Sequence, residues 1–216
     1  MNEEVTIVDY GIGNLLSVSR AFEHFGARVG FAESSPQLRL AKRIVLPGVG
    51  AWRDGMAGLR ARDLVGGLRD AVAKGVPLLG ICLGMQMLLE EGEESPGVEG
   101  LGFIPGRVVA IPRTTHAGQP HKIPHIGWNE ISPPLGVSWE NSLLERLTVS
   151  SACYFVHSYT AEPIDRQHRL ADCYYNGRVI SAVVRRENIT GCQFHPEKSG
   201  AVGLKIIKAF LDRPKR

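Results

Sequence analysis

One stretch organises the chain: Pro77-Leu78-Leu79-Gly80-Ile81-Cys82-Leu83-Gly84-Met85-Gln86. An apolar run typical of a buried strand ends at a cysteine flanked by glycines, and a helix-like pattern begins at once. The spacing Gly80-x-Cys82-x-Gly84 is the cysteine version of a nucleophile elbow, in which a sharp strand-to-helix turn presents a reactive side chain. A thiol at a helix N-terminus ionises more readily, and the thiolate is the nucleophile. Taken alone, the same pattern also fits a buried structural cysteine.

Short β-rich segments alternate with helical patterns in the first half of the chain. Strands are predicted at 5–9, 28–32 and 43–46, with helices at 15–25 and after Pro36. A longer helical pattern over 54–74 contains Gly66-Gly67, where we expect a break. This alternation predicts parallel βαβ units, whose functional sites gather at the carboxyl ends of the strands.

From about residue 107 the pattern changes to strands with few helices between them. The predicted strands are 107–111, 126–131, 153–159, 169–175 and 178–184, and a helix closes the chain at 199–211. Asn176-Gly177 predicts a tight hairpin turn. We therefore expect an α/β fold with a largely parallel central sheet flanked by helices and an additional antiparallel or mixed β layer, built as a single domain over residues 1–216.

Composition restricts the possible partners and compartment. With 216 residues, of which 44% are hydrophobic, the chain can bury a sizeable core. The net charge of +3 is spread along the chain, so we expect neither a nucleic-acid nor a membrane partner. Neither a membrane span nor a signal peptide is recognised, and Arg213–Arg216 fits a solvated tail. Cysteines at 82, 153, 173 and 192 form no disulfide framework, which favours a reduced cytoplasmic enzyme.

A second motif supplies what a cysteine nucleophile needs. In Gln193-Phe194-His195-Pro196-Glu197, the histidine and glutamate stand two apart at a strand end, so extended backbone points both side chains the same way. His195 fits a general base for Cys82, and Glu197 fits the group that fixes its tautomer. An exposed strand-to-helix corner is the alternative interpretation of this motif.

Two other patterns resemble a dinucleotide-binding motif and a metal site, but each lacks residues that such a site requires. Gly11-x-Gly13 lacks the third glycine of a dinucleotide fingerprint, because Leu16 stands there. Prolines deny His116, His121 and His125 a common helical face, and no Cys or Asp joins them. We expect loop histidines, no metal site and no cofactor.

Several motifs together identify a resemblance. Gly80–Gln86 with Gln193–Glu197 resembles the class I, triad-type glutamine amidotransferase family over nearly the whole chain. The segments 9–14, 47–50, 124–129, 154–159 and 195–199 resemble the branch that forms the glutaminase subunits of imidazole glycerol phosphate synthases. Cys192 departs mildly from that branch, where an aliphatic residue is more frequent, and takes no proposed role.

The resemblance implies a mechanism and a set of site residues. Cys82 attacks the side-chain amide of L-glutamine, His195 protonates the departing ammonia, Glu197 supports His195, and water hydrolyses the thioester. The amide of Leu83 and the Val49-Gly50 peptide are the expected oxyanion donors. The resemblance places these residues around the substrate: Gly50, Gln86, Glu94, His157 and Ser158. From the sequence itself, Glu94 also fits a solvated acidic run, and His157 a structural strand histidine.

The resemblance also implies a partner, a cyclase subunit with a (β/α)₈ barrel that uses the ammonia in histidine biosynthesis as one half of a heterodimer. Trp128 and Asn129 are expected at that interface, although a lone Trp is more often core. Three alternatives stay open: a glutaminase serving another acceptor, such as anthranilate or pyridoxal phosphate synthesis; a cysteine peptidase or γ-glutamyl hydrolase; and a catalytically silent regulatory subunit.

Overall fold

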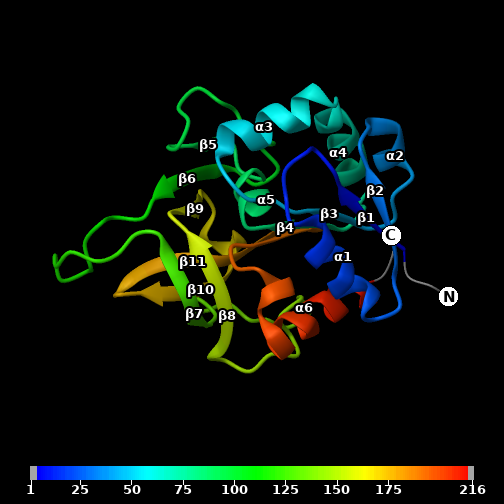
Figure 1. Cartoon of the computed structure of the whole chain (residues 1–216). Coiled ribbons are helices and arrows are strands. Elements are labelled where there is room, and N and C mark those ends of the chain that lie inside the picture. The colour runs from blue at the N-terminus through cyan, green and yellow to red at the C-terminus, as the bar shows by residue number, and fades with distance from the viewer. Residues whose placement is uncertain (1–3, 214–216) are drawn as a thin grey trace.

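A seven-stranded sheet forms the centre of the computed structural model, which describes residues 4–213 (Figure 1). The strand order is β10-β11-β12-β4-β3-β1-β2. The parallel part consists of β1 (Glu4–Val8), β2 (Arg28–Ala32), β3 (Ile44–Leu46), β4 (Leu78–Ile81) and β12 (Ile189–Cys192). At one edge β11 (Arg178–Arg186) and β10 (Arg169–Tyr175) continue the sheet in antiparallel pairing. Residues 214–216 of the expected tail lie outside the described residues.

Helices cover both faces of this sheet, as Figure 1 shows. One face packs against α1 (Leu15–Glu23) and α6 (Gly200–Asp212), and the other against α2 (Ser35–Arg39), α3 (Trp52–Ala61) and α4 (Leu64–Ala73). The strands are apolar on both sides because helices cover both faces of the sheet. Successive side chains of a strand point to opposite faces and so enter different cores. Thus Val45 and Leu79 enter the first core, whereas Ile44 and Leu78 enter the second.

The remaining strands form two small sheets. β5 (Glu91–Gly92), β6 (Gly106–Ala110) and β9 (Tyr159–Pro163) form one, and β7 (His125–Ile131) pairs with β8 (Ser151–His157) in the other. Short helical segments are α5 (Leu83–Gln86), η1 (Arg166–His168) and η2 (Pro196–Lys198). The predicted fold class is confirmed. The antiparallel strands are divided between these small sheets and the β10–β11 edge of the central one.

The predicted helix break at Gly66-Gly67 is wrong. The break lies at Arg62-Asp63, where Asp63 has a φ of 52°, and both glycines are inside α4. A Cβ on Gly67 would lie 2.8 Å from the Cα of Ser35, at the start of α2. Gly67 therefore serves the close packing of α4 on α2, a role that a sequence window does not distinguish from helix termination.

The predicted tight turn at Asn176-Gly177 is confirmed. Asn176 and Gly177 have φ values of 50° and 77°, as the tight turn between β10 and β11 requires. Asn14 caps α1, since its side-chain oxygen accepts a hydrogen bond from the Ser17 amide at 3.3 Å. Among the helices described between residues 4 and 213, none has the length and apolarity to cross a membrane.

Candidate active site

Cys82 occupies the turn between β4 and α5, at the carboxyl end of the parallel strands. Its φ of 54° and ψ of −111° lie outside the regions that residues with side chains favour, at a cost of about 1–3 kcal/mol. The turn is held because the Cys82 amide donates to the carbonyl of Cys192 at 2.8 Å. The Gln86 amide donates to the Cys82 carbonyl at 3.1 Å and closes the first turn of α5. The sharp strand-to-helix turn predicted from the glycine spacing is confirmed.

The flanking glycines let this turn pack directly against backbone. A Cβ on Gly84 would lie 1.9 Å from the carbonyl oxygen of Leu46, at the end of β3, so no side chain fits there. A Cβ on Gly80 would lie 2.8 Å from the carbonyl oxygen of Gly84. The two glycines therefore fix the elbow between β3 and β4.

The turn at residues 47–50, which contains the Val49-Gly50 peptide expected as an oxyanion donor, lies against the elbow. A Cβ on Gly48 would lie 2.8 Å from the amide nitrogen of Gly84. The buried Tyr10 hydroxyl donates to the carbonyl of Pro47 at 2.7 Å and fixes the start of the turn. Gly50 has a φ of 91°, a conformation that glycine adopts without strain. The turn and the first residues of α5, including Leu83, are thus adjacent backbone segments.

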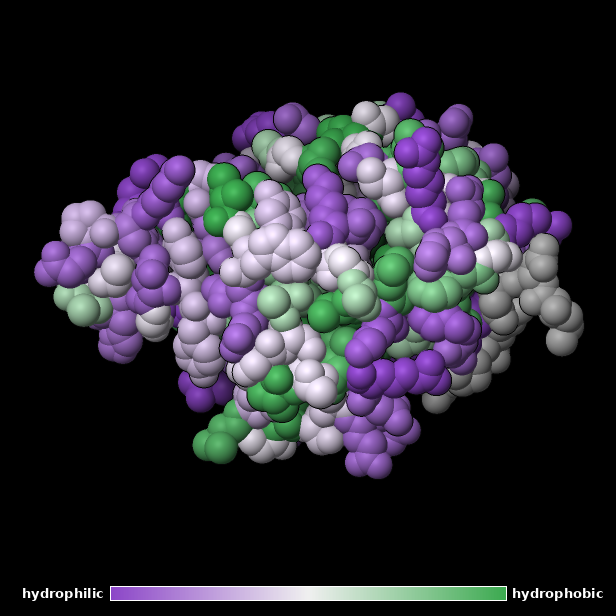
Figure 2. All heavy atoms as spheres, turned by 60° about the horizontal axis from the view of Figure 1, so that its bottom comes forward, coloured by the Kyte–Doolittle hydropathy of each residue, from purple (hydrophilic) through white to green (hydrophobic). Residues whose placement is uncertain are grey.

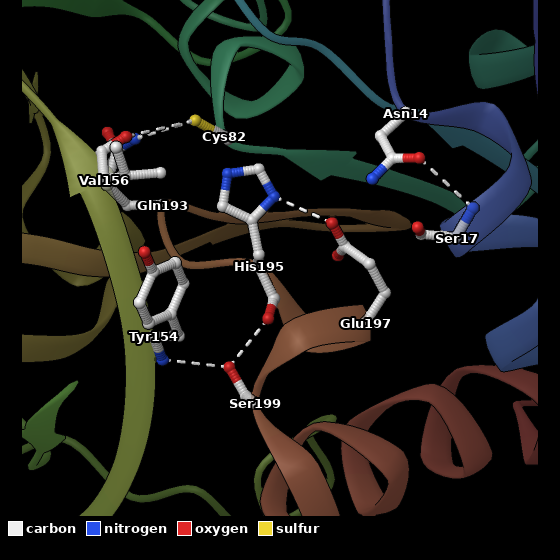
Figure 3. A network of polar contacts seen from close by, with 9 residues as sticks. All are labelled: Asn14, Ser17, Cys82, Tyr154, Val156, Gln193, His195, Glu197 and Ser199. Carbon is white, nitrogen blue, oxygen red and sulfur yellow. Dashed lines mark hydrogen bonds and ion pairs between the residues drawn. The ribbon is translucent and has the colours of Figure 1, made fainter. Parts of the chain in front are cut away.

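His195 and Glu197 follow the strand that pairs with β4. Because β12 runs parallel to β4 with Cys192 opposite Ile81, the residues after both strands emerge at the same edge of the sheet. His195 Nδ1 lies 2.8 Å from Glu197 Oε1, and the two side chains are 4% and 1% exposed. In Figure 3 the imidazole ring lies between Cys82 and Glu197. The structure thus brings together the three residues predicted as the catalytic group.

The charge state of His195 is controlled by these two neighbours. Burial lowers its pKa, but hydrogen bonding to Cys82 and Glu197, together with their charges, outweighs this and raises the pKa to about 9. An imidazolium is therefore favoured between the Cys82 sulfur and the Glu197 carboxylate. This is the arrangement that a cysteine nucleophile with a histidine base requires.

The corner that carries His195 is fastened to β8 by residues that the sequence did not reveal. The buried Ser199 hydroxyl donates to the His195 carbonyl at 2.7 Å and accepts from the Tyr154 amide at 3.0 Å (Figure 3). The His195 amide donates to the Tyr154 carbonyl at 3.0 Å. Ser199 and the Tyr154 backbone therefore fix the position of the ring.

Gln86 is buried behind the nucleophile, one turn along α5 as predicted. Its amide donates to the Tyr159 carbonyl at 3.3 Å and to Gln193 Oε1 at 3.0 Å. Gln193, which was not assigned a role from the sequence, donates in turn to Cys82 Sγ at 3.8 Å. A buried chain of amides therefore ends on the sulfur.

Glu94 lies at the start of α3, beside the 47–50 turn. Its carboxylate accepts the Trp52 amide at 2.7 Å and caps a helix whose N-cap residue, Ala51, has no side chain for this. Glu90 and Glu93 likewise accept backbone amides at 2.9 Å. The acidic run is thus a set of backbone caps around β5 rather than a solvated helix end.

His157 is a buried residue of β8, and both of its ring nitrogens are engaged. Nδ1 lies 2.7 Å from the Tyr159 carbonyl oxygen, and Nε2 lies 2.9 Å from Nδ1 of His125. Burial lowers the pKa of His157 to about 3 and that of His125 to about 4, so the pair is neutral. The half-buried Ser158 follows directly and accepts the Ile111 amide through its carbonyl at 2.9 Å.

The three histidines first considered for a metal do not act together. His121 bonds to Pro112 and Asn176 in the loop, whereas His125 begins β7 and stacks on Tyr175 with ring centroids 4.1 Å apart. The expectation of a loop residue is therefore wrong for His125. Within residues 4–213, no cluster of three His, Cys, Asp or Glu side chains is arranged to hold a metal ion.

Trp128 and Asn129 point to opposite faces of β7, because adjacent residues of a strand alternate. Trp128 is 59% exposed, packs edge-to-face on Tyr154, and lies 3.9 Å from the Cβ position of Gly200. Asn129 instead donates to the Tyr174 carbonyl of β10 at 3.1 Å. The two residues expected at one interface therefore do not share a surface.

The cysteine elbow and the buried His–Glu pair together have the arrangement of a catalytic triad with a cysteine nucleophile. The family model for glutamine amidotransferase class-I matches residues 6–213, and the chain belongs to this family. A structure described as a glutamine amidotransferase superposes with a TM-score of 0.72 at 18% identity, covering 96% of this chain and 97% of that one. PurLQS from Thermotoga maritima gives 0.71 at 17% identity, covering 98% and 99%. These two likenesses concern the fold.

Relatives within the family are more specific. The imidazole glycerol phosphate synthase subunit HisH 1 of Legionella pneumophila (strain Lens) is 51% identical over 208 residues, covering 96% of this chain and 98% of that protein. The subunit HisH of Salinibacter ruber is 45% identical over 211 residues, covering 97% and 94%.

Proposed function

We propose that this chain is the glutaminase subunit of an imidazole glycerol phosphate synthase and supplies ammonia for histidine biosynthesis. The single observation that carries the proposal is the Cys82 elbow facing the His195–Glu197 pair, in a chain about as long as its HisH relatives and 51% identical to one of them. Proteins of one family with this degree of identity over their whole length share their chemistry when the reactive groups are in place.

The reaction proceeds through a thioester. Cys82 passes its proton to His195 and attacks the amide carbon of L-glutamine, and the imidazolium then protonates the departing ammonia. Water, activated by the same ring, hydrolyses the thioester and releases glutamate. Glu197 holds the ring in the tautomer that this exchange needs, and general acid–base transfer of this kind contributes about 10²- to 10⁴-fold.

The oxyanion that forms in both steps needs two donors. We assign them to the Leu83 amide and to the Val49-Gly50 peptide, because Gly48 packs on the Gly84 amide and keeps the two segments adjacent. Removing one such donor typically costs about 10²- to 10³-fold in rate.

The substrate contacts are supported unequally. Gln86 lies beside the nucleophile and Glu94 beside the 47–50 turn, where their hydrogen bonds engage Gln86 Nε2 and Glu94 Oε2. We assign the other side-chain oxygen of each residue to the amino group of glutamine. Gly50, in the 47–50 turn, and Ser158, which follows β8, are proposed to contact the substrate through their backbone groups. His157 offers little, because Tyr159 and His125 already engage its two ring nitrogens.

The partner is a cyclase subunit, which we propose to be a (β/α)₈ barrel forming a heterodimer with this chain. Trp128 supports an interface close to the catalytic corner, since a large exposed aromatic side chain is typical of interface anchors. In Figure 2, white and green residues gather in the centre of the face that carries β8, α6 and α1. We omit Asn129 from the interface because it bonds to β10.

We place the chain in the cytoplasm as a single glutamine amidotransferase domain. All four cysteines are free thiols, as a reducing compartment favours.

The decisive experiment is copurification with a barrel cyclase, followed by a glutaminase assay with and without that cyclase. Stable association and a glutaminase rate that rises in the complex are expected. Failure to associate, or full glutaminase activity of the isolated chain that the cyclase leaves unchanged, would overturn the coupled-subunit function.

A further inference from the structure

Gln193 is a fully buried polar residue that the mechanism above leaves without a role. It follows β12 directly, and its amide nitrogen donates to the Ala182 carbonyl at 2.9 Å, which continues the pairing with β11. Its side chain has an exposure of 0% and reaches the catalytic sulfur rather than the core. Burial of an amide is costly unless its donors and acceptor are satisfied, so its partners show what it serves.

The orientation of this amide is fixed by its two neighbours. Gln86 Nε2 donates to Gln193 Oε1 at 3.0 Å, so the amino group of Gln193 must face the other way, towards Cys82 Sγ at 3.8 Å. The flipped amide would place the amino groups of Gln86 and Gln193 against each other, which is repulsive, because Gln86 Nε2 also donates to the Tyr159 carbonyl and keeps its own orientation. The Gln86 bond therefore selects the donor that the sulfur receives.

The sulfur is thus approached from two sides. In Figure 3 its contacts to Gln193 and to the Val156 carbonyl lie on one side, and the His195 ring lies on the other. The Val156 carbonyl, 3.9 Å from Sγ, is an acceptor and suits only the protonated thiol. The Gln193 amide is a donor and suits the thiolate, because a hydrogen bond to the charged form of a group favours that form.

We propose that Gln193 is a positioning residue that holds the Cys82 side chain and stabilises its thiolate by hydrogen-bond donation, with Gln86 fixing the direction of the amide. The inference deepens the proposed glutaminase function and rests on it for its biological meaning. In the reaction, the proton leaves Cys82 for His195, and the negative charge left on sulfur is held by the imidazolium and by the Gln193 amide. Formation of the thioester removes that charge, so the Gln193 hydrogen bond weakens as the acyl group arrives.

The test measures the reactivity of the thiol itself. The full-length chain is alkylated with iodoacetamide across a range of pH, and labelling of Cys82 is followed by peptide mass spectrometry with Cys82→Ala as the blank. Cys82 is 8% exposed, whereas the other three cysteines are 0% exposed, and burial raises the pKa of Cys153 to about 12, so they react more slowly. Gln193→Met keeps the size of the side chain and removes the amide. Gln193→Glu keeps an acceptor for Gln86 and replaces the donor by a carboxylate oxygen. Thr190→Val, a buried isosteric change in the strand that precedes Gln193, is the matched control.

In Gln193→Met the alkylation rate near neutral pH is expected to fall about tenfold. The midpoint of the pH–rate profile moves to higher pH, while the rate at the alkaline plateau is kept. Gln193→Glu moves the midpoint further, because it adds a negative charge beside the sulfur, and Thr190→Val leaves the profile unchanged. A residue that only filled space would lower the plateau or the thermal midpoint of unfolding without moving the pH midpoint.

A wild-type profile in Gln193→Met overturns the inference, as does a lowered plateau with an unchanged midpoint. If Gln193→Met does not fold, Gln193→Glu decides by the same criterion. Alkylation needs neither glutamine nor a partner, so its outcome is separable from the proposed function. A chain that never hydrolyses glutamine in the presence of a cyclase overturns that function and leaves the alkylation result intact.

Discussion

The carboxylate of Glu197 lies 2.8 Å from Nδ1 of His195, which leaves Nε2 as the ring nitrogen that exchanges a proton with Cys82. The carboxylate accepts only, so it selects the tautomer with the proton on Nδ1 whenever the ring is neutral. Since both side chains are almost fully buried, water does not substitute for either partner. The orientation and the charge of the ring therefore both depend on Glu197.

Replacing Glu197 by Gln is expected to lower the kcat of glutamine hydrolysis about 10³- to 10⁴-fold with little change in KM, because the amide no longer selects the tautomer. The same change removes one cause of the raised pKa of His195, so its titration midpoint falls below about 9. Steady-state glutamate release by the complex and NMR titration of the imidazole measure the two effects. A kcat within about tenfold of wild type would contradict the assigned role.

Replacing Cys82 by Ala is expected to abolish glutamine-dependent synthesis by the complex and to leave synthesis from added ammonia intact. The physical reason is that the nucleophile serves only to release ammonia, which the cyclase then uses. Product formation with each nitrogen source is the measurement. Loss of both activities would mean that the roles of the subunits are misassigned.

Replacing Gly84 by Ala is expected to destabilise the chain by roughly 1–3 kcal/mol or more and to displace the elbow, since the new methyl carbon would lie 1.9 Å from the Leu46 carbonyl oxygen. Gly66→Ala is the matched control, because a Cβ there meets nothing nearer than 4.0 Å, inside a helix. That change should stabilise by about 0.5–1 kcal/mol. Urea unfolding of both variants gives the comparison, and equal effects would refute the packing argument.

The buried pair of His125 and His157 predicts loss of stability in acid. Their folded pKa values of about 4 and 3 lie below the ordinary 6.5, so the unfolded chain binds protons that the folded chain excludes. Above about pH 6.5 the two histidines leave the free energy of unfolding unchanged. As the pH falls from about 6.5 towards 4, each histidine lowers the free energy of unfolding by up to about 1.4 kcal/mol per pH unit.

Urea midpoints measured at descending pH check this slope. His125→Phe, which keeps an aromatic ring against Tyr175, should reduce the slope by about one proton. Removal of the exposed His24, by His24→Gln, is the control for loss of an imidazole. An equal slope in wild type and His125→Phe would remove the pair as the cause.

Replacing Trp128 by Ala is expected to weaken association with the cyclase by about 10- to 1000-fold, as loss of an aromatic anchor does. Thermal unfolding of the isolated chain should change little, since the side chain is 59% exposed. Leu40→Ala is the control, because Leu40 is 82% exposed and precedes β3, at the amino ends of the strands. Calorimetric titration with the cyclase compares the variants, and equal affinities would place the interface elsewhere.

The parallel half of the fold was readable from the sequence because its signals are local. A short β-rich segment marked β1, short apolar runs marked β3 and β4, and the glycine spacing around Cys82 marked the elbow. The placement of β10 and β11 was not readable, since nothing within a strand states which edge it joins. Gly67 was misassigned for a similar reason: only the approach of Ser35 shows that the glycine serves packing.

The candidate site divides in the same way. Cys82, His195 and Glu197 stand in motifs whose residue types already state their chemistry. Gln193 and Ser199 lie within or beside those motifs, but Gln193 contacts Cys82, 111 positions away, and Ser199 joins the His195 corner to Tyr154, 45 positions away. Because the tertiary fold brings these residues to their partners, no fixed spacing in the sequence indicates the contacts. The Gln-Phe-His-Pro-Glu-Lys-Ser run was the only available signal for either residue.

The positive φ of Cys82 has a consequence for the heat resistance of the protein. The backbone there is held in a conformation that glycine adopts freely and that cysteine adopts at a cost of about 1–3 kcal/mol. Glycine at this position would remove the cost, but glycine has no sulfur to act as the nucleophile. Improving thermal tolerance by relaxing this position is therefore incompatible with turnover, and a more robust form of the chain must gain its stability away from the elbow, at positions such as Gly66.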